Sequence, residues 1–347
     1  MDYGIALVPS PDCWKVVKRA EELGFTHAWF YDSQMLYSDV FSCMALAAAN
    51  TSRIKLGTGV LIPTNRIAPM AACGFGTLNQ IAPGRIIFGV GTGFTGRNTM
   101  GQKAMPQKAM REYIRLVRAL LKGEAVSWHA EGRDQLIQYL HPGLGFVNQE
   151  DPVEVHISAF GPKGLKLTIE EGDGWMTFAG GQEAAVSQIR TLLAELTEAG
   201  REPGSLYKTV YTLGCVLGDG ESADGERAMA QAGPQAAVRW HGAMERWDAM
   251  PEAARAAFAA ERALYETYNP EAPYLQLHTG HLVYVRDDER PFVTGDLIRR
   301  STFTGSVGEL RERSEGLAAS GYDQLCVQLV HGHEAAIEDW AAVFGLR

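Results

Sequence analysis

The sequence predicts a (β/α)8 barrel, a closed ring of eight parallel strands in which each strand is followed by a helix. Strand-like apolar segments alternate with helix-like segments from one end of the 347-residue chain to the other. This alternation is typical of βαβ units and a parallel sheet. Eight such units at this length favour a closed barrel over an open sheet. A doubly wound sheet would need a GxGxxG loop after the first strand, and residues 3–11 contain none.

The first half of the chain contains four of these units. Apolar runs predict strands over residues 3–8, 27–32, 54–62 and 85–90. Helical periodicity predicts helices over residues 12–23, 39–50, 68–81 and 108–122. Gly24 and Gly123 follow the first and the last of these helices, and glycine is the usual residue just beyond a helix C-terminus.

The second half contains the remaining four units and two insertions. Residues 124–150 interrupt the rhythm and predict a short hairpin insertion. The predicted strands cover residues 153–159, 174–178, 208–217 and 322–329, and the predicted helices cover 165–171, 183–199, 307–320 and 334–344. The second insertion covers about 221–300, with residues 221–268 almost wholly helical and 274–300 irregular. No linker divides the chain, so we expect one domain over residues 1–347.

Composition and charge narrow the class of protein. The hydrophobic fraction of 46% and charged fraction of 21% are those of a soluble globular chain. The formal net charge of −9 argues against nucleic-acid and membrane partners, but leaves room for a phosphorylated small molecule. The five cysteines have no metal-ligand spacing, so we expect no metal site and reduced, buried thiols. The chain has no leader pattern and no run of 18 apolar residues, so we expect a cytoplasmic location.

Two neighbouring strands end in small residues where side chains would normally pack. The third strand contains Gly57-Thr58-Gly59 and continues through Val60 to Ile62, and the fourth gives way to Gly89-Val90-Gly91-Thr92-Gly93. Glycine in a strand interior marks a bulge or a close approach of the backbone to another group. The two ends lie side by side at the carboxyl edge of the sheet, where α/β folds bind ligands. The alternative is that these glycines serve tight turns only.

The other strand ends supply mostly backbone groups, small residues and hydroxyls. They contain no pair of carboxylates for glycoside hydrolysis, no metal cluster, and no nucleophile beside a base. Such a site suits a flat aromatic cofactor that brings its own reactivity.

A phosphate site is predicted after the fifth strand. That strand ends at Ser158, and Gly161-Pro162-Lys163-Gly164 leads into a helix. Free N–H groups and the positive dipole end of a helix bind phosphate, and Lys163 adds a positive charge. The alternative is an ordinary helix start, with which Pro162 is equally consistent.

Asp32 and His331 are the polar side chains at strand ends that could take part in chemistry. Asp32 ends the second strand, where it either accepts a hydrogen bond or orients a neighbour beside the cofactor ring, or caps a helix. His331 follows the eighth strand, where it either faces the substrate as a general acid or lies at the surface.

The remaining histidines carry weaker signals. His278 and His281 belong to an HTGH segment in the irregular insertion, without the context of a zinc site, and are interpreted as surface or packing residues. His27 begins a strand, at the end of a barrel that serves stability, and His156 lies inside a strand; both are interpreted as structural.

The chain resembles the bacterial luciferase-like superfamily of flavin- and deazaflavin-dependent oxidoreductases, which are (β/α)8 barrels. The resemblance runs through nearly the whole chain and is carried by six segments: AEELGFTHAWFYDS, LGTGVLIPTNRIAP, LNQIAPGRIIFGVGTG, YIRLVRALLKGEAVSWHAEG, VHISAFGPKGLKLTIEEGDGW and FTGSVGELRERSEGLAASGYD. LGTGVLIPTNRIAP and FGVGTG are most similar to the branch that uses the deazaflavin coenzyme F-420.

The resemblance implies an oxidoreductase that transfers hydride between reduced coenzyme F-420 and a small organic substrate. A cis peptide bond between Gly59 and Val60 would support the deazaflavin ring from behind. Asp32 and Gly91-Thr92-Gly93 would contact the ring and linker, and Gly161–Gly164 would hold the phosphate. Ile62 and Ser158 complete the expected cofactor site, and a homodimer is implied. The alternatives are an FMN-dependent monooxygenase supplied by a separate flavin reductase, and a non-catalytic flavin-binding protein.

The sequence departs from the family pattern at the positions that handle protons. Ser33 stands where members often have histidine, and Phe94 stands where the sugar-phosphate dehydrogenase of this branch has an acidic proton donor. The same dehydrogenase has an aromatic residue near its second strand, and the position of that residue corresponds roughly to Tyr37 in this chain. A sugar-phosphate reaction is therefore not expected, and proton transfer falls to another group or to water. We name Asp32, Tyr37 and His331 as the candidate catalytic residues.

Overall fold

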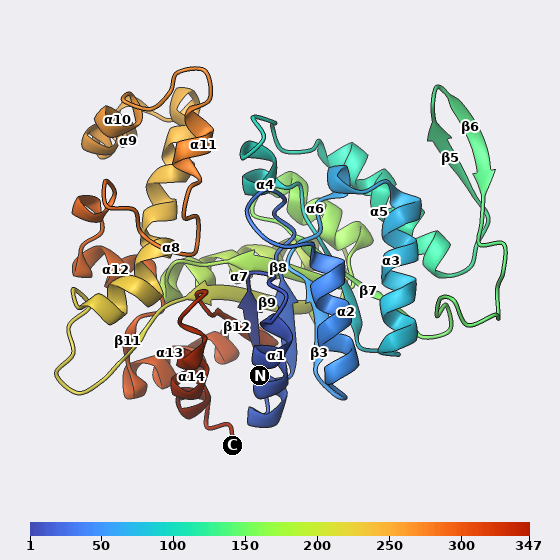
Figure 1. Ribbon diagram of the computed structural model, residues 1–347, viewed down its shortest axis with the longest axis horizontal. Coiled ribbons are helices and arrows are strands. Elements are labelled where there is room, and N and C mark those ends of the chain that lie inside the picture. The colour runs from blue at the N-terminus through green and yellow to red at the C-terminus, as the bar shows by residue number, and fades with distance from the viewer.

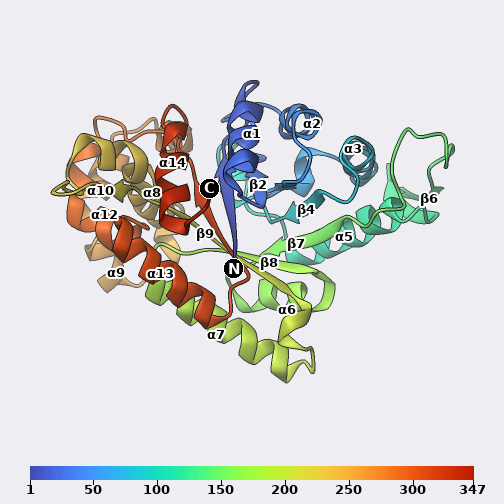
Figure 2. The same cartoon turned by 90° about the horizontal axis from the view of Figure 1, so that it is seen from below.

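The computed structural model describes residues 1–347 and contains a closed barrel of eight parallel strands, which confirms the predicted fold class (Figures 1 and 2). The ring order is β1-β12-β9-β8-β7-β4-β3-β2, and β2 pairs back with β1. The barrel strands are β1 (Asp2–Leu7), β2 (His27–Phe30), β3 (Lys55–Thr58), β4 (Ile86–Val90), β7 (Glu154–Ser158), β8 (Gly174–Phe178), β9 (Tyr207–Leu213) and β12 (Gln324–Gln328).

A layer of helices surrounds the strands, as the view from below shows most clearly (Figure 2). These helices are α1 (Cys13–Leu23), α2 (Val40–Asn50), α3 (Ala68–Ile81), α5 (Gln107–Leu121), α6 (Pro162–Glu171), α7 (Gln182–Glu198), α13 (Val307–Ser320) and α14 (Ile337–Phe344). Their buried faces form one apolar core with the outward-facing side chains of the strands. No helix combines the length and the hydropathy that crossing a membrane requires.

Two groups of elements lie outside the barrel and its layer of helices. The antiparallel strands β5 (Val126–Ala130) and β6 (Arg133–Ile137) form a hairpin that projects from one side of the molecule (Figure 1). The second insertion forms the yellow and orange group on the other side of Figure 1, and comprises α8 (Glu226–Glu245), α9 (Glu252–Ala256), α10 (Ala259–Tyr265), α11 (Pro273–Leu277) and α12 (Gly295–Ser301). It has an apolar cluster of its own, which includes Trp240 and extends to Leu213 and Val330 of the barrel.

Some details differ from the predictions. The segment predicted as one strand over residues 208–217 forms two strands, β9 and a short second one. They are separated at Gly214, where the Phe303 backbone comes so close that a Cβ on Gly214 would lie 2.0 Å from the Phe303 carbonyl oxygen. The chain leaves the barrel at this close approach, and β10 (Val216–Leu217) pairs instead with β11 (Gly305–Ser306). A short helix, α4 (Phe94–Asn98), was not predicted. Cys73 is exposed, whereas the other four cysteines are buried.

The barrel interior is filled with side chains, so it is not open from end to end. Trp29, Tyr211 and Met176 belong to a buried cluster inside the ring. Gly57 makes room for Trp29, because a Cβ at this position would lie 2.4 Å from Cζ3 of the indole. Gly89 likewise makes room for the Thr58 carbonyl oxygen, which would lie 1.8 Å from a Cβ. These two glycines therefore serve packing and not a ligand, contrary to the interpretation of the whole glycine-rich stretch as a ligand site.

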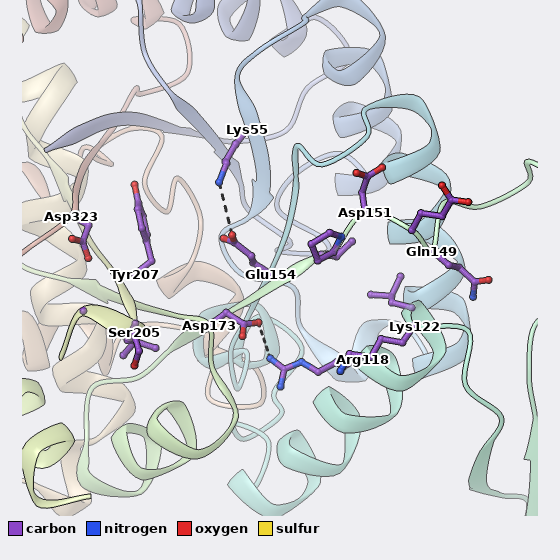
Figure 3. A pocket seen from close by; sticks show the side chains of 16 residues that line it. Lys55, Arg118, Lys122, Gln149, Asp151, Glu154, Asp173, Ser205, Tyr207 and Asp323 are labelled. Carbon is purple, nitrogen blue, oxygen red and sulfur yellow. Dashed lines mark hydrogen bonds and ion pairs between the residues drawn. The ribbon is translucent and has the colours of Figure 1, made fainter. Parts of the chain in front are cut away.

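A hollow at the amino-terminal end of the barrel is lined mainly by charged side chains (Figure 3). Two ion pairs form between charged residues of this lining. Arg118 Nη2 lies 2.8 Å from Asp173 Oδ2, and Lys55 Nζ lies 4.0 Å from Glu154 Oε1. In barrels of this type the amino-terminal end serves stability. A charged surface of this kind does not suit a flat apolar ring.

Candidate active site

A cavity of about 830 Å³ lies at the carboxyl ends of the strands. The loops after β2, β3, β4 and β7 line it, together with the start of α6 and two short segments of the second insertion. Every residue predicted to bind the cofactor lines this one cavity: Asp32, Gly59, Val60, Ile62, Gly91, Thr92, Gly93, Ser158, Gly161, Pro162, Lys163 and Gly164. The closed barrel brings them together because their strand ends are neighbours in the ring.

The loop after β3 forms one wall of the cavity. The peptide bond between Gly59 and Val60 is cis, as the resemblance implied. The Gly59 N–H donates to the Phe30 carbonyl at 2.7 Å, and Val60 packs against the cluster inside the barrel. Val60 also lies so close to the end of β4 that a Cβ at Gly91 would be 2.7 Å from its Cγ2. The rigid interior therefore holds this loop in place from below.

Asp32 holds the next part of the same loop. Its Oδ2 accepts a hydrogen bond from the Ile62 N–H at 3.0 Å, and Nη1 of Arg66 lies 2.8 and 2.9 Å from its two carboxylate oxygens. The Asp32 side chain is 5% exposed. It does not cap a helix, because Asp39 caps α2 by accepting a hydrogen bond from the Ser42 N–H. In this structure Asp32 orients its neighbours and has little free hydrogen-bonding capacity.

The start of α6 has the features of an anion site. The helix has no side-chain cap, and its first intrahelical hydrogen bond runs from the Leu165 N–H to the Gly161 carbonyl at 2.9 Å, so the N–H groups of Lys163 and Gly164 have no acceptor within the helix. A Cβ at Gly161 would meet no atom within 4 Å, so this residue leaves open space beside the helix terminus. Lys163 is exposed, lines the cavity, and forms no ion pair. The free donors, the dipole and the ammonium group together suit a phosphate.

The opposite side of the cavity is built from two tyrosines and the second insertion. The Tyr37 hydroxyl donates to the His281 carbonyl at 2.8 Å, and the Tyr31 hydroxyl donates to Oε1 of Gln328 at 2.8 Å. The amide nitrogen of Gln328 donates in turn to the Leu282 carbonyl at 3.0 Å. Burial raises the pKa of both tyrosines above the ordinary value, so both hydroxyls stay protonated and act as donors.

One candidate catalytic residue lies elsewhere. His331 does not line the cavity; its side chain is 53% exposed, and its Nδ1 lies 3.1 Å from Oε1 of Glu334. Two cavity residues, His281 and Arg246, were not proposed from the sequence. Both come from the second insertion, where no periodic pattern places a residue relative to the barrel. The HTGH segment was the one available signal, and it was interpreted as surface or packing.

Comparison with known proteins shows the family to which the chain belongs. A family model described as luciferase-like monooxygenase matches residues 11–324. The chain belongs to the luciferase-like monooxygenase family. A solved structure of the luciferase-like fold, the coenzyme F-420-dependent tetrahydromethanopterin reductase from Methanopyrus kandleri, has a TM-score of 0.71 and 22% identity, and the match covers 98% of this chain and 97% of that chain. At that identity the likeness concerns the fold.

Two relatives are more similar to this chain in sequence than that solved structure is, over part of their length. The 5,10-methylenetetrahydromethanopterin reductase of Methanolobus tindarius is 32% identical over 216 residues, which are 61% of this chain and 64% of that protein. The F-420-dependent glucose-6-phosphate dehydrogenase of Kineococcus radiotolerans is 33% identical over 207 residues, which are 55% of this chain and 60% of that protein. The matches thus span about three fifths of these relatives.

Proposed function

We propose that this protein is an oxidoreductase that transfers hydride between reduced coenzyme F-420 and a small organic substrate. The observation that carries the proposal is the start of α6, which has no side-chain cap and has open space at Gly161 beside the free Lys163 side chain. The Gly59–Val60 bulge lines the same cavity. A relative of similar sequence is named as F-420-dependent. The donor set and the open space fit a ring cofactor with a phosphate-bearing tail.

Each residue has a distinct task in this proposal. Val60 supports one face of the ring, because the side chains beneath it fill the barrel. The Lys163 and Gly164 amides bind the phosphate, and the Lys163 ammonium group neutralises part of its charge. Ser158 and Thr92, which line the cavity between the two regions, hydrogen-bond the linker. When bound, the reduced deazaflavin supplies the hydride and, lacking the ring nitrogen of FMN, does not activate oxygen.

Asp32 and Tyr37 position groups around the substrate. Asp32 keeps the Ile62 loop in place through the hydrogen bonds described above, and Tyr37 holds the backbone of the insertion over the cavity. Phe94 lines the cavity at the position of the expected acidic proton donor. An apolar side chain there favours an uncharged, partly apolar substrate over a sugar phosphate.

An activity assay tests this proposal against its main alternative. Reduced F-420 is mixed with the protein and a panel of ketones, enones and imines without oxygen, and the return of the oxidised chromophore is followed. Reduced FMN and oxygen are mixed with the protein and the same panel in parallel, and oxygenated products are sought. Substrate-dependent oxidation of F-420 supports the proposal. An oxygenated product that forms only with reduced FMN and protein would favour a monooxygenase that depends on a flavin reductase, and binding without any turnover would favour a flavin-binding protein.

The assembly and location remain part of the proposal. We expect a homodimer in the cytoplasm, on the family resemblance. Light scattering of the purified protein measures the mass directly, and a mass of one 37.9 kDa chain would contradict the dimer.

A further inference from the structure

The second insertion places one histidine in the cavity in a fixed position. His281 follows α11, and hydrogen bonds from Tyr37 to its carbonyl and from Gln328 to the next carbonyl hold its loop on two sides. Leu282 has φ +57, a conformation that a leucine adopts only where contacts enforce it. The backbone that carries the His281 ring is therefore held from two sides of the barrel mouth, by Tyr37 after β2 and by Gln328 at the end of β12.

The imidazole of His281 has one enclosed face and one face toward the cavity. The residue is 7% exposed and lines the cavity. Its ring packs against those of His278 and His241, with centroids 5.5 and 6.0 Å apart. Of its two ring nitrogens, Nδ1 is enclosed and has no hydrogen-bond partner, whereas Nε2 is not among the enclosed atoms. Nδ1 has no partner in either tautomer, whereas a proton on Nε2 lies where a group in the cavity can accept it, so a bound acceptor selects the tautomer with the proton on Nε2.

This imidazole is a neutral donor. Burial and the two neighbouring histidines lower the pKa of His281 well below its ordinary value, so the ring carries no charge at neutral pH. The neutral Nε2–H donates one hydrogen bond and introduces no charge into the cavity. A neutral imidazole of this kind can polarise a carbonyl group.

The other polar side chains on this side of the cavity are already engaged. The Tyr31 and Tyr37 hydroxyls donate to protein acceptors, and the Asp32 carboxylate is bound to Arg66 and to the Ile62 amide. Arg246 is exposed, and its Nε donates to the Gly242 carbonyl at 3.0 Å. His281 is thus the buried cavity residue with a free donor.

We infer that His281 Nε2–H hydrogen-bonds the oxygen of a carbonyl substrate, and that the substrate class of this enzyme is therefore aldehydes or ketones with an apolar body. The inference rests on the proposed hydride transfer. The carbonyl carbon accepts the hydride, the π pair of the C=O bond moves to oxygen, and that oxygen takes a proton from water. The carbonyl compound is reduced by two electrons to an alcohol and the coenzyme would be oxidised by two. The proton that the coenzyme would lose on oxidation neutralises the hydroxide left by the water. His281 stabilises the charge that develops on the oxygen and keeps its own proton.

The test compares a ketone with an oxygen-free compound of the same shape. Cyclohexanone and methylenecyclohexane are titrated by calorimetry into the protein loaded with F-420, or with FMN if F-420 does not bind. Failure to bind F-420 contradicts the proposed function alone, and the ketone comparison then continues with FMN. We expect wild type to prefer cyclohexanone by about tenfold, the effect of one buried hydrogen bond. No preference in wild type would overturn the inference.

Variants separate the hydrogen bond from packing. His281→Phe should abolish the preference, and His281→Gln, which keeps an N–H, should retain part of it. His278→Phe makes the same change three residues earlier in the same loop, at a residue that does not line the cavity, and should leave the preference intact. An equal loss in His278→Phe and His281→Phe would overturn the inference. If His281→Phe does not fold, the infrared carbonyl stretch of cyclohexanone bound to the wild-type protein is measured instead. A wavenumber lower than that of cyclohexanone in hexane supports the inference, and the same wavenumber as in hexane overturns it.

Discussion

Asp32 and Arg66 form a largely buried ion pair that joins the end of β2 to the loop after β3. Both carboxylate oxygens of Asp32 lie within 2.9 Å of Nη1 of Arg66, and the two side chains are 5% and 18% exposed. The same carboxylate holds the Ile62 amide. Through this pair, a residue that seemed suited to chemistry fixes the wall against which we expect the cofactor ring to lie.

Replacing Asp32 should therefore affect stability as well as binding. In Asp32→Asn, Arg66 keeps only its ion pair with Asp39 and loses the more deeply buried of its two carboxylate partners, so we expect the free energy of unfolding to fall by about 2 kcal/mol. Urea unfolding measures this change. Glu338→Gln is the control, because it removes an exposed partner of Arg19 and should change little. Equal effects of the two substitutions would contradict the role given to Asp32.

Gly161→Val tests the phosphate site. The position has open space and an extended backbone (φ −125°, ψ 170°) that suits valine, so the thermal midpoint should not change. The new side chain fills the space beside the free amides, and we expect the affinity for F-420 to fall at least about tenfold, as for a lost hydrogen bond to a charged group. Fluorescence titration measures the affinity. Gly204→Val, at an equally open glycine beside the opposite end of the barrel, should leave it unchanged.

Gly57→Ala should destabilise the barrel without touching the cavity. Its Cβ would lie 2.4 Å from the fully buried Trp29 ring, and overpacking of this kind costs about 2 kcal/mol. Chemical unfolding measures the loss. Trp29→Phe should recover part of it in the double variant, because the smaller ring makes room. Additive effects of the two substitutions would show that the close approach is not the cause.

His27 should make stability depend on pH. Burial, with the nearby Lys55 and His156, lowers the pKa of His27 from 6.5 to about 3. Between these values the unfolded chain binds more protons than the folded one. The contribution is fully present above pH 6.5 and falls by about 1.4 kcal/mol for each pH unit below it. His27→Gln should flatten the dependence of unfolding free energy between pH 6 and 5 by that amount, and parallel curves would contradict the assignment.

Periodicity and turn chemistry were sufficient to predict the barrel and the strand ends that line the cavity. The helix predicted over residues 68–81 has the same bounds as α3, because apolar periodicity begins and ends there with few competing signals. The site residues at strand ends could be grouped because a parallel barrel gathers such ends at one edge. Their roles in binding remain predictions.

The insertion could not be placed in this way. His281 and Arg246 reach the cavity only because α8 and the loop after α11 fold back over the barrel mouth, and that packing depends on contacts far apart in the sequence. The split of the predicted strand at Gly214 has a similar origin, since it results from the approach of Phe303. Such long-range contacts leave no local signal in the sequence.

A side-by-side titration of the purified protein with F-420 and FMN tests most directly whether the protein uses F-420 as its cofactor. Fluorescence of each compound is followed as protein is added, with Gly161→Val as the matched variant. The proposed function predicts tight binding of F-420, much weaker binding of FMN, and loss of F-420 binding in the variant. Tighter binding of FMN than of F-420 by the wild-type protein would contradict it.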